Sequence, residues 1–101
     1  MFDLINKLGD VKKKMDEIKA RLDLITVDGI VSNGKVKVSV TGNRKVKSIS
    51  VDDSLMNIEN KEELLDLLEI AMNDALSKAE SVSEAEMKSA GRDFLPGFPG
   101  F

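Results

Sequence analysis

The spacing of apolar residues changes once in this sequence, near residue 25, and the change limits the folds open to the chain. Before it, apolar residues follow one another at alternating steps of four and three positions: Leu4, Leu8, Val11, Met15, Ile18, Leu22 and Ile25. This spacing predicts a helix of ~22 residues, about 33 Å long, with one continuous apolar stripe. After it, apolar and polar residues alternate with a period of two, which is typical of β-strands.

Three short runs rich in β-branched residues follow the predicted helix, at residues 27–32, 35–41 and 45–51. They are separated by two turn sequences, Asn33-Gly34 and Gly42-Asn43-Arg44, the first of which suits the positive φ angles of a tight hairpin. In the middle run Val36, Val38 and Val40 share one face. The alternation slips between Val46 and Ile49, which indicates a β-bulge. The runs predict a three-stranded antiparallel meander, apolar on one face and partly basic on the other.

The second half of the chain predicts one more long helix. Asn60 followed by Glu63 has the form of a capping box, and a wide apolar stripe comes after it. The stripe consists of Leu64, Leu65, Leu67, Leu68, Ala71, Met72, Ala75, Leu76 and Ala79. The segment 83–86 either starts a short last helix or continues this one. Glycine and proline interrupt residues 91–101, so we expect residues 1–90 to form a single domain and residues 91–101 a flexible tail without regular structure.

The residue types missing from the chain exclude most catalytic chemistry. There is no His, Cys, Trp or Tyr among the 101 residues. The chain therefore has no side chain that normally titrates near neutral pH and no thiolate nucleophile or soft metal ligand. Asp52 and Asp53 are the one candidate carboxylate pair, but neighbours on an extended chain point apart and Asp-Asp-Ser is a common turn and cap sequence. We expect no enzyme activity, no cofactor and no metal site.

The sequence also indicates where the protein resides. No run approaches the ~18 apolar residues of a membrane span. Residues 1–4 include a charge instead of opening the apolar run of a signal peptide. We expect a cytoplasmic protein with no membrane partner.

Charge is unevenly distributed along the chain, although the net charge is only −3. Residues 1–28 carry six acids and six bases, residues 29–51 carry five bases and no acid, and residues 52–86 carry eleven acids and two bases. A negative net charge argues mildly against nucleic acid, whereas a basic middle segment favours an anionic partner.

The first helix carries bases on both flanks of its stripe. Lys12 and Lys19 lie on one flank, and Lys7, Lys14 and Arg21 lie on the other. In a two-helix coiled coil these flanks would bring bases against bases, so self-pairing through the stripe is disfavoured. Two interpretations stay open, and both can hold at once. The stripe packs on the sheet or on the acidic second helix, whose carboxylates neutralise the flanks, or the bases stay exposed and contact phosphates.

The sheet segment has its own bases: Lys35, Lys37, Arg44, Lys45 and Lys47. They are either phosphate contacts, which position a protein on DNA without reading its sequence, or an ordinary solvated sheet face with edge protection. No aromatic residue lies between Phe2 and Phe94, so stacking on bases, as in RNA-recognition and single-strand modules, has no platform there.

Residues 34–55 resemble the YbaB/EbfC family of bacterial nucleoid-associated proteins. The matching pattern is a Gly, an alternating Val/Lys strand, a turn, and the segment Val46-Lys47-Ser48-Ile49-Ser50-Val51-Asp52-Asp53-Ser54-Leu55. Residues 67–79 look like the family's second helix, with its Asn-x-Ala-x-x-Lys-Ala pattern, and a Gly/Pro/hydrophobe tail is also similar. The resemblance covers nearly the whole chain.

The resemblance implies an α+β protomer of order α-β-β-β-α, an intertwined homodimer formed through the sheet, and helices that project like the arms of a tweezer. It also implies binding to duplex DNA with weak sequence preference. Family contacts are attributed to the projecting helices, so the bases of the first helix carry over. These are Lys7, Lys12, Lys13, Lys14, Lys19 and Arg21. Family members often have a Met- and Gln-rich first helix, whereas this one is rich in Lys and Asp.

We therefore predict a homodimeric nucleoid-associated protein that binds double-stranded DNA through backbone electrostatics and affects nucleoid organisation or gene expression. The five sheet bases are secondary candidates. The alternative is a protein-interaction adaptor that uses the acidic second helix and the tail hydrophobes. These hydrophobes are Phe94, Leu95, Phe98 and Phe101.

Overall fold

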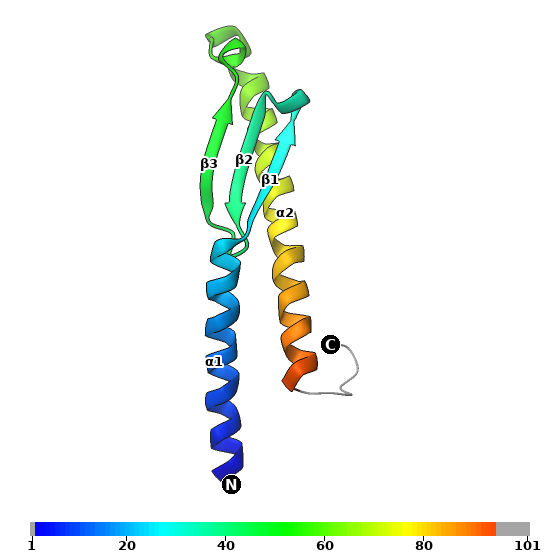
Figure 1. The fold of residues 1–101 in the computed structure, drawn as a ribbon. Helices are drawn as coiled ribbons and strands as arrows, with labels where there is room; N and C mark the ends of the chain where they lie inside the picture. The colour runs from blue at the N-terminus through cyan, green and yellow to red at the C-terminus, as the bar shows by residue number, and fades with distance from the viewer. Residues whose placement is uncertain (1, 95–101) are drawn as a thin grey trace.

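A computed structural model describes the backbone of residues 2–94 and the side chains of residues 7–91. Two long helices flank three strands (Figure 1). Their bounds are α1 Phe2–Leu24, β1 Thr26–Val31, β2 Val36–Thr41, β3 Val46–Val51 and α2 Lys61–Phe94. Short 3-10 turns lie at Ser32–Gly34, Asp53–Leu55 and Ile58–Asn60. The predicted α+β class and the order helix, three strands, helix are confirmed.

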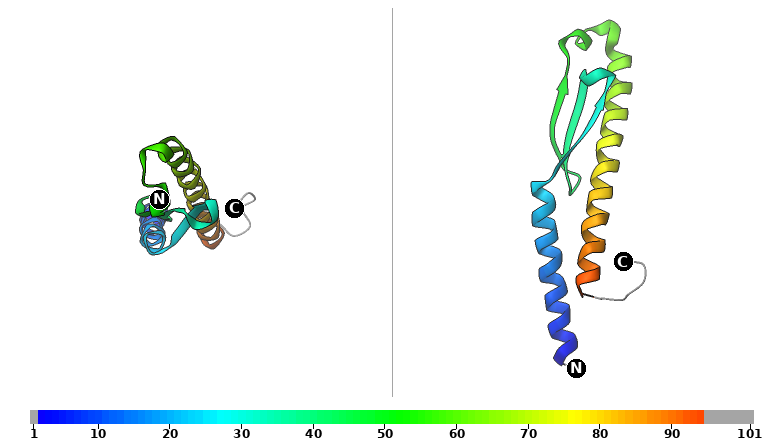
Figure 2. Two further views of the ribbon diagram at one scale, coloured as in Figure 1. Left: turned by 90° about the horizontal axis from the view of Figure 1, so that it is seen from above. Right: turned by 45° about the vertical axis from the view of Figure 1, so that its right-hand side comes forward.

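The molecule is long and thin. It measures 66 × 23 × 16 Å with a radius of gyration of 18.9 Å, against about 13 Å for a compact chain of this length. One half of α2 lies on the sheet and the other half runs antiparallel to α1, which projects beyond the sheet (Figures 1 and 2). A large share of the surface is therefore available to partners.

The sheet is an antiparallel meander in the order β1-β2-β3, as predicted. Ser39 pairs with Ser48 and Val40 pairs with Val46, so Lys47 is an extra residue on β3. This is the β-bulge that the slipped alternation predicted. The hairpin between β1 and β2 is confirmed, with positive φ angles at Asn33 (57°) and Gly34 (88°), but its connection is longer than the expected two-residue turn: Val31 pairs with Val36, and Ser32 also has a positive φ (54°).

The main core lies between α2 and one face of the sheet. Val36, Val38 and Val40 point toward α2 and are fully buried. On α2 the facing residues are also fully buried: Ala71, Ala75 and Ala79. Opposite them on β1, a Cβ at Gly29 would lie 1.8 Å from the carbonyl oxygen of Ala71. Small residues on both sides thus let the helix approach β1 more closely than larger side chains would permit.

A second, smaller core joins the two helices. Ile18 and Leu22 of α1 pack with Ala90 of α2, and three partly buried side chains contribute around them: Met15, Ile25 and Val82. Part of the α1 stripe therefore packs on the second helix, which was one of the two interpretations left open. The stripe is not covered along its whole length, because Leu8 and Val11 are exposed.

Two sequence-based expectations about α2 are wrong. The backbone N–H of Asn60, which a capping box would pair with Glu63, donates to Oδ1 of Asn57 instead (2.9 Å). Helix α2 also continues past residues 83–86 and through Gly91 to Phe94, although regular structure was expected to stop before residue 91. Burial of Ala90 against α1 stabilises this end and offsets the ~1 kcal/mol that glycine costs a helix. Residues 95–101, the rest of the expected tail, lie outside the described residues.

Within residues 2–94, no helix is both long enough and apolar enough to cross a membrane.

The close packing at Gly29 yields the first prediction. Gly29→Ala places its methyl group against the α2 backbone and should lower the free energy of unfolding by on the order of 3 kcal/mol. The matched control is Gly9→Ala, because a Cβ at that position meets nothing within 4 Å. This control should gain about 0.5 to 1 kcal/mol from helix propensity. Urea unfolding at one protein concentration measures both, and equal effects would contradict the packing described here.

Candidate nucleic-acid interface

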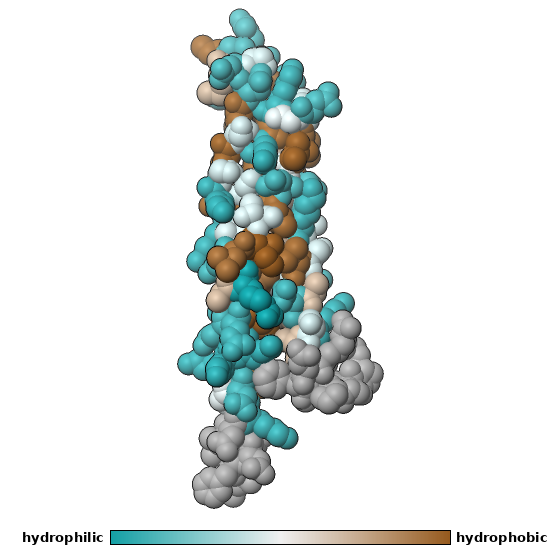
Figure 3. Space-filling model, viewed as in Figure 1, coloured by the Kyte–Doolittle hydropathy of each residue, from teal (hydrophilic) through white to brown (hydrophobic). Residues whose placement is uncertain are grey.

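Five of the six bases of α1 lie on the two flanks of its apolar stripe, and the sixth lies on the face turned away from α2. Because Ile18 and Leu22 face α2, helical spacing places Lys12 and Lys19 on one flank and residues 7, 14 and 21 on the other. Lys13 lies on the opposite face. All of these side chains are exposed except Lys14, which is half-buried. The surface of α1 below the sheet is correspondingly hydrophilic (Figure 3).

Few of these bases are neutralised within the protomer. Arg21 Nη2 lies 2.7 Å from Glu86 Oε2 on α2, and Lys14 Nζ lies 4.0 Å from Glu17 Oε2 one helical turn away. Among the side chains of residues 7–91, no carboxylate lies within 4.0 Å of the ammonium groups of Lys7, Lys12, Lys13 or Lys19. Among the side chains of residues 7–91, neutralisation by the acidic helix, one of the two open interpretations, therefore reaches Arg21 alone.

The position of the acids on α2 explains this result. Four of them, Glu62, Glu63, Asp66 and Glu69, lie in the first three turns of the helix, at the end farthest from α1 (Figure 1). The part of α2 that meets α1 lies around Val82, Glu86 and Ala90. Asp74, Glu80, Glu84 and Glu86 lie further along α2, so the charge segregation of the sequence is only partly retained along the long axis of the molecule.

The β2–β3 hairpin is bound to the end of α1. Gly42 N donates to the carbonyl oxygen of Leu22 (3.0 Å), and Asn43 Nδ2 donates to the carbonyl oxygen of Lys19 (2.9 Å) and to Asp23 Oδ1 (2.6 Å). This contact places the exposed Arg44 and Lys45 beside the C-terminal end of α1. The turn was predicted from Gly42 and Asn43, but no sequence signal identified α1 as its partner.

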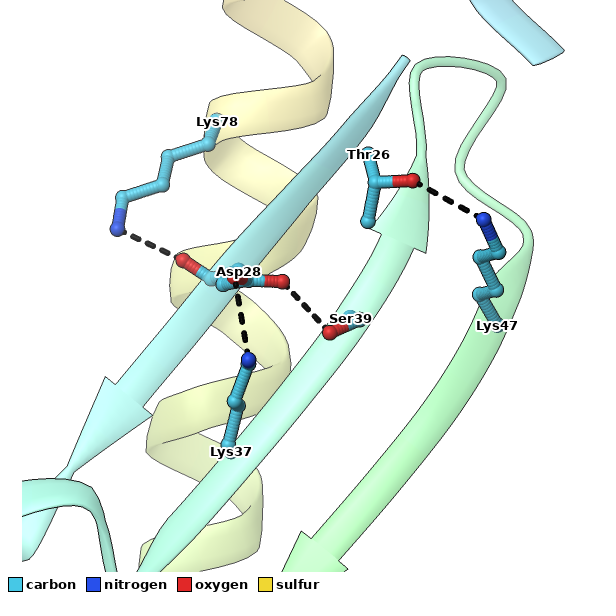
Figure 4. A network of polar contacts seen from close by, with 6 residues as sticks. All are labelled: Thr26, Asp28, Lys37, Ser39, Lys47 and Lys78. Atoms are coloured by element: carbon cyan, nitrogen blue, oxygen red, sulfur yellow. Dashed lines mark hydrogen bonds and ion pairs between the residues drawn. The ribbon is translucent and has the colours of Figure 1, made fainter. Parts of the chain in front are cut away.

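The other three sheet bases lie outside the turn that binds α1. Lys37 Nζ is 3.6 Å from Asp28 Oδ2, and Lys47 Nζ donates to Thr26 Oγ1 at 3.4 Å, both on the face of the sheet opposite α2 (Figure 4). Lys35 lies at the far end of the sheet, where its carbonyl oxygen accepts a hydrogen bond from Asp52 N (2.7 Å). Three of the five sheet bases, Arg44, Lys45 and Lys47, therefore lie at the end of the sheet next to α1, and Lys35 and Lys37 lie farther from it.

Asp28 is the centre of a polar network that ties β1 to β2 and α2. Ser39 Oγ donates to its carboxylate (2.6 Å), and Lys78 Nζ donates to its carbonyl oxygen (2.8 Å) while also pairing with Asp74 (3.0 Å). The Ser39 hydroxyl, followed by the nearby Lys37 charge, holds the pKa of the Asp28 carboxyl below its usual value. The network has a structural role, and it occupies part of the outer edge of β1.

Four bases were not selected from the sequence: Lys61, Lys78, Lys88 and Arg92. Lys78 is held in the Asp28 network. Lys88 is exposed and lies on α2 between Glu86 and Ala90, the residues that contact α1. It therefore belongs to the same end of the molecule as the α1 bases. Only the antiparallel packing of α1 and α2 reveals this, because the two segments lie far apart in the sequence.

The carboxylate pair that was considered for catalysis has a capping role instead. Asp52 Oδ2 accepts hydrogen bonds from the backbone N–H of Ser54 (3.0 Å) and from its hydroxyl, and it caps the turn Asp53–Leu55. These two donors lower the pKa of the Asp52 carboxyl. The turn and cap interpretation of this segment is confirmed.

The Asp28 network predicts a pH effect. In Ser39→Ala the pKa of Asp28 should rise toward 3.8, because the hydrogen bond that favours its charged form is lost. A lowered carboxyl pKa stabilises the fold above the pKa of the unfolded chain, and this contribution disappears as the pH falls through the folded pKa. The stability difference between wild type and Ser39→Ala should therefore be larger at pH ~6 than at pH ~2.

Carbon-detected NMR titration of Asp28 and acid unfolding curves measure these two effects. Ser48→Ala is the control, since Ser48 pairs with Ser39 across the strands but does not contact Asp28. An unchanged Asp28 pKa in Ser39→Ala would contradict the assignment.

Comparisons with known proteins agree on one family. A sequence profile described as the YbaB/EbfC DNA-binding family matches residues 1–94. A nucleoid-associated protein of Flavobacterium johnsoniae is 41% identical over 99% of this chain and 92% of its own length. One from Afipia carboxidovorans is 36% identical over 93% and 90%. The crystal structure of an uncharacterized Helicobacter pylori protein superposes with a TM-score of 0.71 at 25% identity, covering 91% of this chain and 92% of that one.

Proposed function

Since this chain belongs to the YbaB/EbfC DNA-binding family, we propose that it binds double-stranded DNA as a homodimer, through electrostatic contacts between α1 and the phosphate backbone. The contacting surface, called here the α1 arm, consists of residues 7–21 together with the hairpin bases Arg44 and Lys45. The family and its nucleoid-associated relatives support DNA as the partner. The mode of contact is inferred from the charges described above.

The observation that carries the proposal is a row of lysines on a helix that projects from the sheet; Lys7, Lys12, Lys13 and Lys19 pair with no carboxylate among the side chains of residues 7–91. Residues 7–21 span about 21 Å, along which duplex DNA presents about twelve phosphate charges. Four of the nine carboxylates of α2 lie at the other end of the molecule, and Glu86 is the described one that pairs with a base of the arm. Lysines at this spacing neutralise phosphates and release counterions, which is the main source of sequence-independent affinity.

The uncovered side of β3 supports the homodimer. Helix α2 covers β1 and β2, so Val46 and Ile49, which share the face of the buried valines, stay 52% and 51% exposed. Within the described residues β3 is hydrogen-bonded to β2 alone, whereas the other edge strand, β1, receives Lys78 at its outer edge. An apolar face beside a free strand edge is the surface through which a second copy can extend the core. Such a dimer presents two arms.

The proposed contacts read little sequence. Bonds to phosphate fix a protein on the duplex but carry no base information, and residues 3–93 contain no aromatic side chain that could stack on bases or wedge between them. We infer that the protein binds DNA with weak sequence preference and resides in the cytoplasm on the nucleoid. By covering DNA it would affect nucleoid organisation or gene expression.

An adaptor function is the second candidate, and one feature of the described residues favours it. Ile58, which is 91% exposed, and Met56 lie beside the acidic start of α2, where an apolar and basic segment of another protein would fit. A variant with Met56→Ser and Ile58→Ser that loses capture of a protein partner but keeps DNA binding intact would support this candidate over the first.

The DNA proposal predicts a steep salt dependence. If about six phosphates are neutralised, log affinity should fall with log salt with a slope near −5. Lys12→Gln and Lys19→Gln should each reduce the magnitude of that slope by about 0.9 for every arm in contact with DNA. Filter binding with a random-sequence duplex measures the slope.

The matched control is Lys61→Gln. Lys61 is also exposed and also on a helix, but it begins α2 at the end of the molecule opposite the arm. Its removal should leave the slope unchanged. A slope near zero, or no binding at about 50 mM salt, where such contacts are strong, would overturn the proposal.

A further inference from the structure

Helix α1 is joined to the sheet by a single residue. The helix ends at Leu24 and β1 begins at Thr26, so Ile25 alone connects them. A one-residue connection restricts the angle between α1 and the sheet but does not fix it, because the two backbone dihedrals of that residue can still turn the helix. The direction of α1 must therefore be held by contacts with other parts of the chain.

Helix α2 holds one side and one flank of α1. Ile18 and Leu22 pack on Ala90, and Arg21 Nη2 lies 2.7 Å from Glu86 Oε2. All of these contacts come from the same neighbouring helix. They leave the other flank of α1, which carries Lys19, to be held by a different element.

The β2–β3 hairpin holds that other flank. Asn43 Nδ2 donates to the carbonyl oxygen of Lys19 (2.9 Å) and to Asp23 Oδ1 (2.6 Å). Helical spacing places Lys19 and Asp23 about 100° and 140° around the axis of α1 from Ile18. Arg21 lies about 60° from Ile18 in the opposite sense. The Asn43 side chain and the ion pair with α2 therefore hold α1 from opposite flanks, which fixes its rotation.

Backbone contacts bring the hairpin close enough to α1 for these bonds. Gly42 N donates to the carbonyl oxygens of Leu22 and Ile25, both at 3.0 Å. The hairpin thus supplies a partner for a carbonyl group at the end of α1, where the helix itself offers none. A Cβ at Gly42 would lie 2.8 Å from Leu22 Cδ2 and 3.0 Å from the Leu22 carbonyl oxygen, so a larger residue would push the hairpin away from α1.

The hairpin is itself tied to the sheet. Thr41 N donates to the carbonyl oxygen of Lys45 (2.8 Å), and Arg44 N donates to that of Thr41 (2.9 Å). The Thr41 hydroxyl oxygen also accepts a hydrogen bond from Asn43 N (3.2 Å). Because these bonds close the turn between β2 and β3, the hairpin can pass the orientation of the sheet on to α1.

We propose that Asn43 is a positioning residue, which fixes the direction and rotation of α1 relative to the sheet. It thereby keeps the lysines of α1 and the hairpin bases Arg44 and Lys45 on one continuous surface. Asn43 itself makes no phosphate contact in this account. The use of this orientation in DNA binding rests on the proposed function, whereas the orientation itself does not.

Residual dipolar couplings measure the orientation of α1 without DNA. Amide couplings of residues 7–21 and of the three strands each yield an alignment tensor, and the two tensors should agree in the wild type. Asn43→Ala should reduce the tensor magnitude of residues 7–21 by about a third or more relative to the sheet, because the released flank lets α1 move. Equal tensors in Asn43→Ala would overturn the proposal.

The matched control is Asn57→Ala. Asn57 is also a capping asparagine, with Oδ1 accepting from Asn60 N (2.9 Å), but it lies near the start of α2 and away from α1. Its replacement should leave the two tensors equal. A loss of alignment in α1 as large as that in Asn43→Ala would show a general effect of lost caps and would contradict the proposal.

Asp23→Ala is a milder second variant. It removes one of the two acceptors of Asn43, and it also removes an acid from the end of α1, where acids are unfavourable, so the helix is not endangered. Its α1 tensor should fall between those of the wild type and Asn43→Ala. If Asn43→Ala fails to fold, this variant decides the question, and an unchanged α1 tensor would then overturn the proposal.

Filter binding with a random-sequence duplex tests the consequence for DNA. Asn43→Ala removes no charge, so the slope of log affinity against log salt should stay at the wild-type value. The affinity should fall about threefold or more at every salt concentration, because the arm is less preorganised. If the wild type does not bind, the proposed function fails and the dipolar couplings still decide the role of Asn43. If the wild type binds and Asn43→Ala binds equally well, Asn43 does not position the arm for DNA.

Discussion

The close approach of α2 to β1 at Gly29 is the contact on which the rest of the structure depends. With no side chain at Gly29 and with alanine at the facing positions of α2, the helix lies almost against the strand backbone. That contact aligns α2 with the sheet, so its second half continues past the sheet and meets Ile18 and Leu22. The direction of α1 therefore depends on how α2 packs on β1.

The same arrangement separates the charges. The acids of the first turns of α2 lie at the sheet end, and the bases of α1 lie at the other, with Arg21 and Glu86 as the pair that joins the two helices. The net charge of −3 hides this separation. A chain that is acidic overall can in this way present a basic arm to DNA, because affinity for phosphate depends on the local charge and much less on the sum over the molecule.

Much of the fold was predictable from spacing alone, because local periodicity reports which face of an element is buried. The valines of β2, the bulge at Lys47 and the hairpin at Asn33-Gly34 were all confirmed. The end of α2 was not predictable from local signals: Gly91 reads as a helix breaker, but Ala90 packs on α1, and tertiary packing outweighs propensity. The capping box failed for a similar reason, since the nearby Asn57 competes for the same N–H.

The candidate site was only partly predictable. The α1 bases could be selected from the sequence because helical spacing excludes them from the apolar stripe. The position of Arg44 and Lys45 beside α1 could not. It depends on hydrogen bonds from Gly42 and Asn43 to residues of α1 that lie more than 19 positions earlier in the chain. Lys37 looked equivalent to Arg44 and Lys45 in the sequence and lies farther from α1, beside Asp28. Such long-range contacts leave no trace in the composition of either segment.

The central claim is that the α1 arm is the surface that contacts DNA. The most direct measurement is an amide chemical-shift titration of the protein with a short random-sequence duplex. The account predicts that the largest shifts fall in residues 7–21 and in the hairpin at Arg44 and Lys45, with little change in residues 58–70. Shifts concentrated on the outer face of the sheet around Lys37 and Lys47, or at the acidic start of α2, would contradict it.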